Sequence, residues 1–465
     1  MTPVQAAETS TAGAAPPEIS RLPRHLGTWN AALVMVTATI GVGILQSPGV
    51  VAAKTGGIAL SYMAWVVGAI AAACGSLVMA ELAVRTPRSG GSTVYLHEAF
   101  GPRVAFMFGW TSMLFNPCAT AAITLVSVRN LGAILNLSEV TQSALRFAWV
   151  GGITVLGMRS SRVVARIVGG AGVFKISALI AVVALCFVGD RSGPVSAAAA
   201  APAIASPWVS FGLAVIATMF AYDGWDYLAL VAGEVRQPAR TLPRATFLGI
   251  ILVLAVYLSV NTGFFYALPF GEMATNPALV ATAVGHVIGE NTGKFVTIFV
   301  SLSAACTVFS ILLCQPRVIF ALAEEGQFFR AAAYVHPRWK TPLFAIAING
   351  LITLLYIASG SGFERLTRYM ILGFLPFYGL VAIAAVMARR RAPPSPGQYS
   401  MPLYPLPVVL MLAYVVCGLA SGLAGDFVAS AVGLATIGAG AIVYEVWHRI
   451  RRTNTIAPAP GSAPP

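Results

Sequence analysis

The chain has 465 residues, of which 57% are hydrophobic and only 10% are charged, and its net charge is +13. Soluble globular proteins carry about 25% charged residues, so this composition excludes an ordinary soluble domain and favours a protein of the lipid bilayer. The positive charge does not indicate a nucleic-acid partner, because the basic residues gather in particular loops between apolar segments.

Apolar stretches long enough to cross a bilayer recur along the whole length. The sequence predicts an all-α integral membrane protein with twelve transmembrane helices. These spans are expected at 29–54, 58–84, 103–135, 144–158, 166–189, 208–232, 244–268, 291–323, 342–360, 364–388, 404–423 and 428–449. The segment 269–290 is long and part-apolar, and it is a candidate for a short re-entrant or capping helix.

The lysines and arginines predict the orientation of the chain. With the N-terminus in the cytoplasm, most of the 29 basic residues fall on the cytoplasmic side, and both termini are cytoplasmic. This group includes Arg85, Arg88, Arg103, Arg159, Arg162, Arg166, Arg236, Arg240, Arg244, Arg389, Arg390 and Arg391. Residues 1–27 and 453–465 are polar or rich in Ala and Pro, and we expect them to be disordered cytoplasmic tails.

The first predicted span is interrupted at Ile40-Gly41-Val42-Gly43-Ile44. The two glycines free the backbone, so we expect the N–H groups from Val42 to Leu45 to lose their helical partners. The half-helix that starts there would direct its positive end into a cavity, which suits a carboxylate. The alternative is close packing of helices through small residues.

The sixth predicted span is interrupted at Phe220-Ala221-Tyr222-Asp223-Gly224-Trp225-Asp226. Asp223 lies at the expected mid-depth of the membrane, where it could accept a hydrogen bond from an ammonium group or carry a proton. Alternatively, the carboxylate faces a wet vestibule or caps freed amides. The aromatic residues of this break either gate a substrate or pack in the core. Paired breaks in two halves of a many-helix protein point to the central binding site of a transporter.

Other polar groups lie inside or at the ends of predicted spans. Lys175 stands about nine residues into its span, where a buried ammonium needs a partner unless it snorkels to the interface. We expect Glu81 and Glu234 to pair with loop arginines, and Asn116 and Asn261 to hydrogen bond across helices. The six cysteines lie in apolar segments without metal spacing, and no cofactor is expected.

These motifs resemble the amino acid–polyamine–organocation transporters, and within them the L-type amino acid transporter branch. The likeness covers about residues 28–390. Residues 41–45 are similar to the family's Gly-Ser-Gly-Ile-Phe, with Val42 for Ser and Leu45 for Phe. Further matching segments, in order, are Ala80-Glu81-Leu82, 87–91, Phe100-Gly101, 220–225, 234–244 (with Gln237 for Asn), 321–326, His336-Pro337-Arg338 and Thr341-Pro342.

The resemblance implies a LeuT-type fold, with a ten-helix core of two inverted five-helix repeats over 28–390 and two accessory helices over 391–452. It implies that residues 40–44 bind the α-carboxylate of an amino acid and that carbonyls near Phe220, Tyr222 and Asp223 bind its α-amino group. Phe220 would be the gating aromatic, with Trp225 beside it. Lys175 matches a lysine that replaces a sodium ion in the family, so sodium dependence is not expected.

We therefore expect a secondary active transporter of amino acids, not an enzyme, that works by alternating access through sodium-independent exchange or proton-coupled uptake. A polyamine or organic-amine permease is the alternative, since Asp223 stands where exchangers often carry a neutral residue. No cysteine lies near 136–146, where animal members join a heavy subunit. The chain is thus predicted to be a free-standing permease of the bacterial plasma (inner) membrane, with the amino acid, the lipid bilayer and protons as candidate partners.

Overall fold

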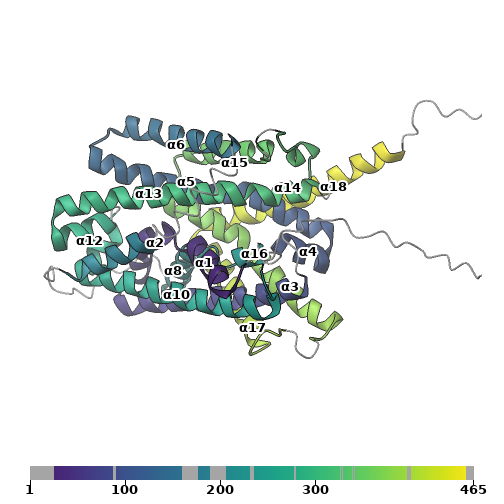
Figure 1. The fold of residues 1–465 in the computed structure, drawn as a ribbon, viewed down its shortest axis with the longest axis horizontal. Helices are drawn as coiled ribbons and strands as arrows, with labels where there is room; N and C mark the ends of the chain where they lie inside the picture. The colour runs from purple at the N-terminus through teal and green to yellow at the C-terminus, as the bar shows by residue number, and fades with distance from the viewer. Residues whose placement is uncertain are drawn as a thin grey trace, which may run out of the picture.

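The computed structural model describes residues 26–86, 91–159, 176–188, 206–230, 235–276, 279–324, 326, 328–337, 339, 341–394 and 399–456 (Figure 1). Within these ranges every regular element is helical, apart from an isolated parallel bridge between Leu26 and Val235. The expectation of an all-helical chain is confirmed for these residues.

The helices follow one another with short connections. Before the sixth predicted span they are α1 (Thr28–Thr39), α2 (Gly43–Thr55), α3 (Ile58–Arg85), α4 (Ser92–Phe100), α5 (Pro102–Leu135), α6 (Glu139–Arg159) and the helix Ile176–Cys186. They continue as α8 (Pro207–Tyr222), α9 (Tyr227–Leu230), α10 (Pro238–Ala267), α11 (Phe270–Thr275), α12 (Leu279–Ile288), α13 (Glu290–Cys314) and α14 (Pro316–Glu324). The last are a 3-10 turn (Arg330–Ala333), α15 (Leu343–Ala358), α16 (Phe363–Arg391), α17 (Leu406–Gly425) and α18 (Phe427–Ile456).

Six described helices, α3, α5, α10, α16, α17 and α18, are long and apolar enough to cross a membrane. The pair α1 and α2, bent by 53° at its break, makes a seventh candidate span. Large side chains on the outside are widely exposed, as at Leu355 (61%), Val416 (65%) and Ile442 (67%). Such apolar surface is expected where a helix faces lipid tails. These observations support a multi-pass membrane protein, and the count of twelve spans remains a prediction.

The structure adds detail at two places. The segment 269–290 holds α11 and α12, so the expected short helix there is confirmed. The predicted span 291–323 is divided at Gln315 into α13 and α14. Pro316 explains the division, because proline has no N–H to continue the hydrogen-bond ladder and is tolerated at the first position of a new helix.

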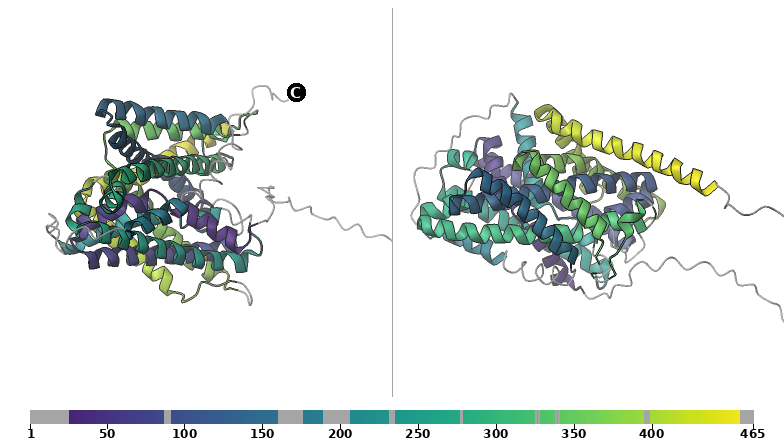
Figure 2. Two further views of the ribbon diagram at one scale, coloured as in Figure 1. Left: turned by 60° about the vertical axis from the view of Figure 1, so that its left-hand side comes forward. Right: turned by 90° about the horizontal axis from the view of Figure 1, so that it is seen from above.

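The broken helices lie in the middle of the bundle. Figure 1 shows α1, α2 and α8 between α13 on one side and α10 on the other, and Figure 2 shows α18 running past the bundle at its edge. Three of the largest fully buried side chains, Trp65, Tyr222 and Tyr257, form an edge-to-face and tilted aromatic cluster around the breaks. The core of the molecule therefore holds the two interrupted segments in place.

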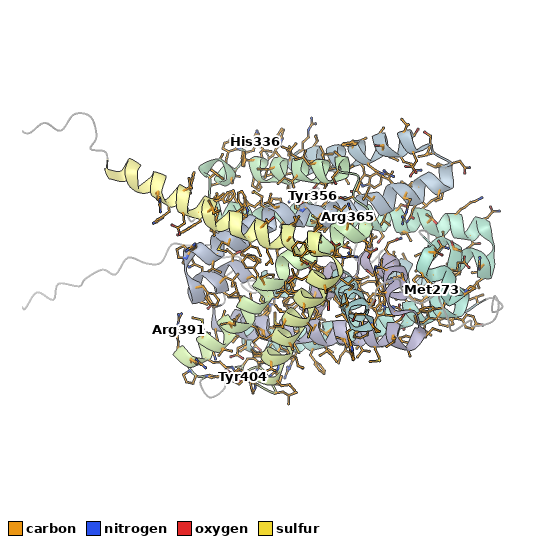
Figure 3. All side chains as sticks on the ribbon, turned by 180° about the vertical axis from the view of Figure 1, so that it is seen from behind. Met273, His336, Tyr356, Arg365, Arg391 and Tyr404 are labelled. Atoms are coloured by element: carbon orange, nitrogen blue, oxygen red, sulfur yellow. The ribbon has the colours of Figure 1, made fainter. Side chains whose placement is uncertain are left out.

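A buried carboxylate fastens one end of the bundle. Glu81 is fully buried, and it accepts hydrogen bonds from Arg85 Nε at 3.1 Å and Arg389 Nε at 2.7 Å. The backbone N–H of Met401 donates to the same carboxylate at 2.9 Å. The expected pairing of Glu81 with arginines is confirmed, whereas Glu234 lies outside the described residues. This end is the predicted cytoplasmic end, and Figure 3 labels Tyr404 toward it.

Candidate functional site

The two breaks meet, and each presses a glycine against the backbone of the other. A Cβ atom added at Gly43 would lie 2.7 Å from Ala221 Cα in α8. In return, a Cβ added at Gly224, which has φ +108°, would lie 3.0 Å from the carbonyl carbon of Ala38 in α1. Because both obstacles are backbone atoms, no side-chain rotation can make room. Both breaks predicted from the sequence are confirmed, and the contact between them is reciprocal.

A single tyrosine joins the ends of the two helices that stop at the breaks. The hydroxyl of Tyr257 in α10 lies 3.0 Å from the carbonyl oxygen of Thr39 and 2.5 Å from that of Ala221. Carbonyls in the last turn of a helix lack intrahelical partners, so this hydroxyl supplies a donor exactly once to two acceptors that compete for it. No sequence signal marked Tyr257, because an aromatic residue in an apolar span is usually a packing residue.

Opposite ends of helix dipoles converge here. α2 begins at Gly43, so the N–H groups of Gly43 and Ile44 have no partner within the helix. The expectation was wrong for Leu45, whose N–H donates to the Val42 carbonyl at 3.0 Å. α1 and α8 end at Thr39 and Tyr222 with their carbonyl ends. A partial positive end thus lies beside two partial negative ends, an arrangement complementary to a zwitterion.

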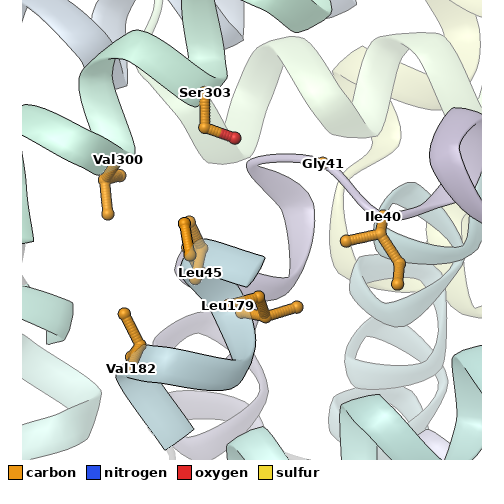
Figure 4. A pocket seen from close by; sticks show the side chains of 8 residues that line it. Ile40, Gly41, Leu45, Leu179, Val182, Val300 and Ser303 are labelled. Atoms are coloured by element: carbon orange, nitrogen blue, oxygen red, sulfur yellow. The ribbon is translucent and has the colours of Figure 1, made fainter. Parts of the chain in front are cut away.

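A small pocket adjoins the first break (Figure 4). Its lining residues come from the break, from the helix Ile176–Cys186 and from α13: Ile40, Gly41, Leu45, Ala178, Leu179, Val182, Val300 and Ser303. The pocket has a volume of only ≈ 20 Å³, whereas one water needs about 10–15 Å³. A solute larger than one or two waters therefore enters only if these helices move apart. The lining is apolar except for the Ser303 hydroxyl and the backbone of the break.

The predicted site residues of the first break divide into two groups. Ile40 and Gly41 line the pocket. Val42, Gly43 and Ile44 are buried, and Gly43 faces α8 rather than the pocket. The first group can touch a solute in this pocket through side chain or backbone, whereas the second group sets the position of the backbone.

The predicted residues of the second break lie on the other side of the contact. The Phe220 ring meets the Phe363 ring edge-to-face at a centroid distance of 5.4 Å, and Tyr222 donates its hydroxyl proton to the Trp65 carbonyl at 3.1 Å. Tyr222 therefore packs as a core residue. Ala221 contributes its backbone to the Gly43 contact.

The end of α8 is held by neighbouring helices. Asp223 follows the last residue of α8 and is half-buried. Trp225 is buried, its ring packs 5.2 Å from that of Tyr378, and Ser76 donates to its carbonyl at 3.2 Å. Lys175 lies outside the described residues.

A second polar link crosses the bundle near this break. Asn116 Nδ2 in α5 donates to Gln315 Oε1 at 2.5 Å, and Gln315 Nε2 donates to the Tyr227 hydroxyl at 3.3 Å. The expectation that Asn116 bonds across helices is confirmed. It was wrong for Asn261, whose Nδ2 donates to the Tyr257 carbonyl of its own helix at 2.8 Å. The described residues contain no group of three or more His, Cys, Asp or Glu side chains that could hold a metal ion.

A bundle of membrane-length helices in which two broken helices meet at the centre is the architecture of a membrane transporter. A solved structure with this fold is Mhp1, a nucleobase–cation-symport-1 family transporter in a closed conformation with bromovinylhydantoin bound. It matches with a TM-score of 0.54 and 15% sequence identity, over 92% of each chain.

The chain belongs to the amino acid permease family, which it matches over residues 26–441. Among curated relatives, the serine/threonine exchanger SteT of Bacillus subtilis is 29% identical over 85% of this chain and 90% of its own length. The b(0,+)-type amino acid transporter 1 of Rattus norvegicus is 27% identical over 86% and 82%. The human cystine/glutamate transporter is 27% identical over 83% and 77%. The family resemblance is confirmed, and the relatives are transporters rather than enzymes.

Proposed function

We propose that this chain is a secondary active transporter that carries a small neutral amino acid across the plasma membrane by alternating access. One observation carries the proposal: the two breaks meet through Gly43 and Gly224, so that the positive end of α2 lies beside the negative ends of α1 and α8. An α-amino acid has one carboxylate and one ammonium a few atoms apart, which is the charge pattern that these helix ends complement.

The side-chain preference follows from the pocket beside the first break. Leu45, Leu179, Val182 and Val300 offer apolar contacts, and Ser303 offers one hydroxyl. Such a lining favours a short neutral side chain over a charged one, because a charge would lack a partner there. The name of the serine/threonine exchanger, a relative of this chain, agrees with that preference.

The proposed roles follow the geometry of the breaks. The backbone from Ile40 to Ile44 holds the substrate carboxylate, and carbonyls at the end of α8, from Phe220 to Asp223, hold the ammonium. Phe220 closes over the substrate together with Phe363, and Trp225 keeps the second break in place. Lys175 takes the place of a coupling sodium ion, so that transport is sodium-independent exchange or proton-coupled uptake.

The proposed arrangement in the membrane has twelve spans and two cytoplasmic termini. Residues 28–390 form a core of two inverted five-helix repeats, and 391–452 form two accessory helices. The reciprocal contact of Gly43 and Gly224 supports the repeat, because related halves would make the same contact twice. We propose the bacterial inner membrane as the location, without a disulfide-linked heavy subunit.

The test is thermal unfolding of the purified protein in sodium-free buffer with serine, ethanolamine or putrescine. Ethanolamine is serine without its carboxylate, so the pair isolates the carboxylate site. A ligand at 100 times its Kd stabilises the folded state by about 2.7 kcal/mol, which gives a measurable rise in Tm. Stabilisation by serine alone supports the proposal. Stabilisation by putrescine and not by serine would mean that the half-buried Asp223 selects an organic amine, and the function proposed here would be rejected.

A further inference from the structure

A second and larger cavity lies outside the central site. It has a volume of ≈ 210 Å³, against ≈ 20 Å³ for the pocket beside the first break. It is enclosed by α5, α6, the end of α15 and the turn 360–363 that leads into α16. The predicted orientation puts this end of the bundle outside the cell. The structure therefore has an open chamber there while the central pocket is closed.

Two arginines from different helices line this chamber. Arg129 in α5 donates from Nη2 to Gln46 Oε1 at 3.2 Å. Arg146 in α6 has its Nη2 3.6 Å from Glu139 Oε2, a carboxylate on a residue side chain that is 81% exposed. Arg146 Nε is buried and has no hydrogen-bond partner within the part of the chain that the structure describes. Two positive charges thus share one cavity, and no acidic side chain is among its lining residues.

The chamber borders directly on the central site. Phe363 lines it, and the same ring packs on Phe220, the proposed gate. Gln46, the partner of Arg129, belongs to α2 and lies three residues after Gly43. A solute in the chamber is therefore one aromatic layer away from the two breaks, and one of its arginines is hydrogen-bonded to the helix that begins at the first break.

The positive charge continues into a neighbouring cavity of ≈ 440 Å³, which shares Gly360 and Gly362 with the chamber. Its charged lining residues are Lys54, Glu364, Arg365, Arg368 and Asp426. Lys54 pairs with Glu364 at 3.2 Å, and Arg368 pairs with Asp426 at 2.5 Å. These pairs balance within the second cavity and leave the arginines of the chamber uncompensated, so the mouth of the bundle attracts anions.

We infer that Arg129 and Arg146 form an outer carboxylate site, which binds the carboxylate of an amino acid before the solute passes Phe220 and Phe363. Guanidinium groups present paired N–H donors in the geometry that a carboxylate accepts, and the Arg146 Nε gains the partner that it lacks. That the carboxylate belongs to the transported amino acid rests on the proposed function. The carboxylate chemistry of the site itself does not.

The experiment measures binding of lactate to the purified full-length protein at constant ionic strength. Lactate has a carboxylate and no amino group, so its binding requires neither transport nor the ammonium subsite. We expect Arg146→Gln to weaken lactate binding by about tenfold, since a charge-assisted pair is lost. Arg146→Lys keeps the charge without the fork and should give an intermediate loss. Lys294→Gln removes an exposed cation near the start of α13 and should leave binding unchanged.

Three results would overturn the inference. They are equal binding of lactate to the wild-type protein and Arg146→Gln, no binding to either, and displacement of lactate by chloride at equal concentration, which would make the site a general anion site. A matched Tm for all variants excludes misfolding as the cause of a loss. In proteoliposomes Arg146→Gln should raise the KM for serine about tenfold at an unchanged maximal rate. Lactate binding without any serine transport would reject the proposed function and leave the outer site standing.

Discussion

The contact between the breaks predicts that Gly43 tolerates no side chain. In Gly43→Ala the new Cβ lies 2.7 Å from Ala221 Cα, and 3.2 Å from both Ala221 N and Phe220 O. Carbon atoms prefer about 3.5–4.0 Å, so α2 and α8 must separate by roughly 1 Å. Overpacking of this kind costs about 1–3 kcal/mol. If the substrate needs both breaks in register, its affinity falls by about five- to hundredfold, because each 1.4 kcal/mol is a factor of ten.

The assay compares serine binding, sodium-free uptake and Tm in Gly43→Ala, Gly43→Leu and a control. Gly57→Ala is the control, since a Cβ at that position meets nothing within 4 Å. We expect graded loss of binding from Ala to Leu, with Gly43→Leu inactive although it still inserts into the membrane, and wild-type behaviour for Gly57→Ala. Normal uptake and a normal Tm in Gly43→Leu would refute the reasoning, because the two breaks could then not be in contact in the transporting protein.

Three further predictions concern hydrogen bonds and charges. Tyr257→Phe removes the hydroxyl shared by the Thr39 and Ala221 carbonyls, and we expect a loss of about 1–3 kcal/mol in unfolding free energy or serine affinity, measured by denaturation and binding. Glu81→Ala leaves two buried arginines without their carboxylate and should destabilise the protein by about 3–5 kcal/mol; a Tm equal to that of the wild type would contradict this. Asp223→Asn should change the pH dependence of uptake or the preference for cationic amino acids. An unchanged pH curve and substrate profile would leave Asp223 with a structural role.

The positions of both breaks were predictable, because the backbone chemistry that causes them is local. Gly41 and Gly43 interrupt one apolar run, and Gly224 with its flanking aspartates interrupts another. The helices stop at Thr39 and Tyr222 as that pattern indicates. Likewise, a glutamate at the end of an apolar span needs a cation nearby, and Glu81 has two.

The partners of the breaks were not predictable from the sequence. Tyr257 lies more than 200 residues from Thr39 along the chain and reads as one aromatic among many in an apolar helix. Ser303 and Val182 line the pocket only because α13 and the helix Ile176–Cys186 pack against the first break. Periodicity identifies which helices are apolar, whereas the face that each turns to its neighbour depends on packing in three dimensions. The same limit hid the pairing of Arg146 with the chamber above Phe363.

The reciprocal glycine contact also bears on how the substrate preference of this chain can change. A side chain at Gly43 or Gly224 meets main-chain atoms, so no second substitution can compensate for it by trimming a neighbour. Leu179, Val182 and Ser303 are different, because they reach the pocket as side chains from helices that do not belong to the joint. We expect new specificities to arise by exchange at these three positions, while the joint stays fixed. Selection of variants for growth on a larger amino acid would show whether the changes fall there.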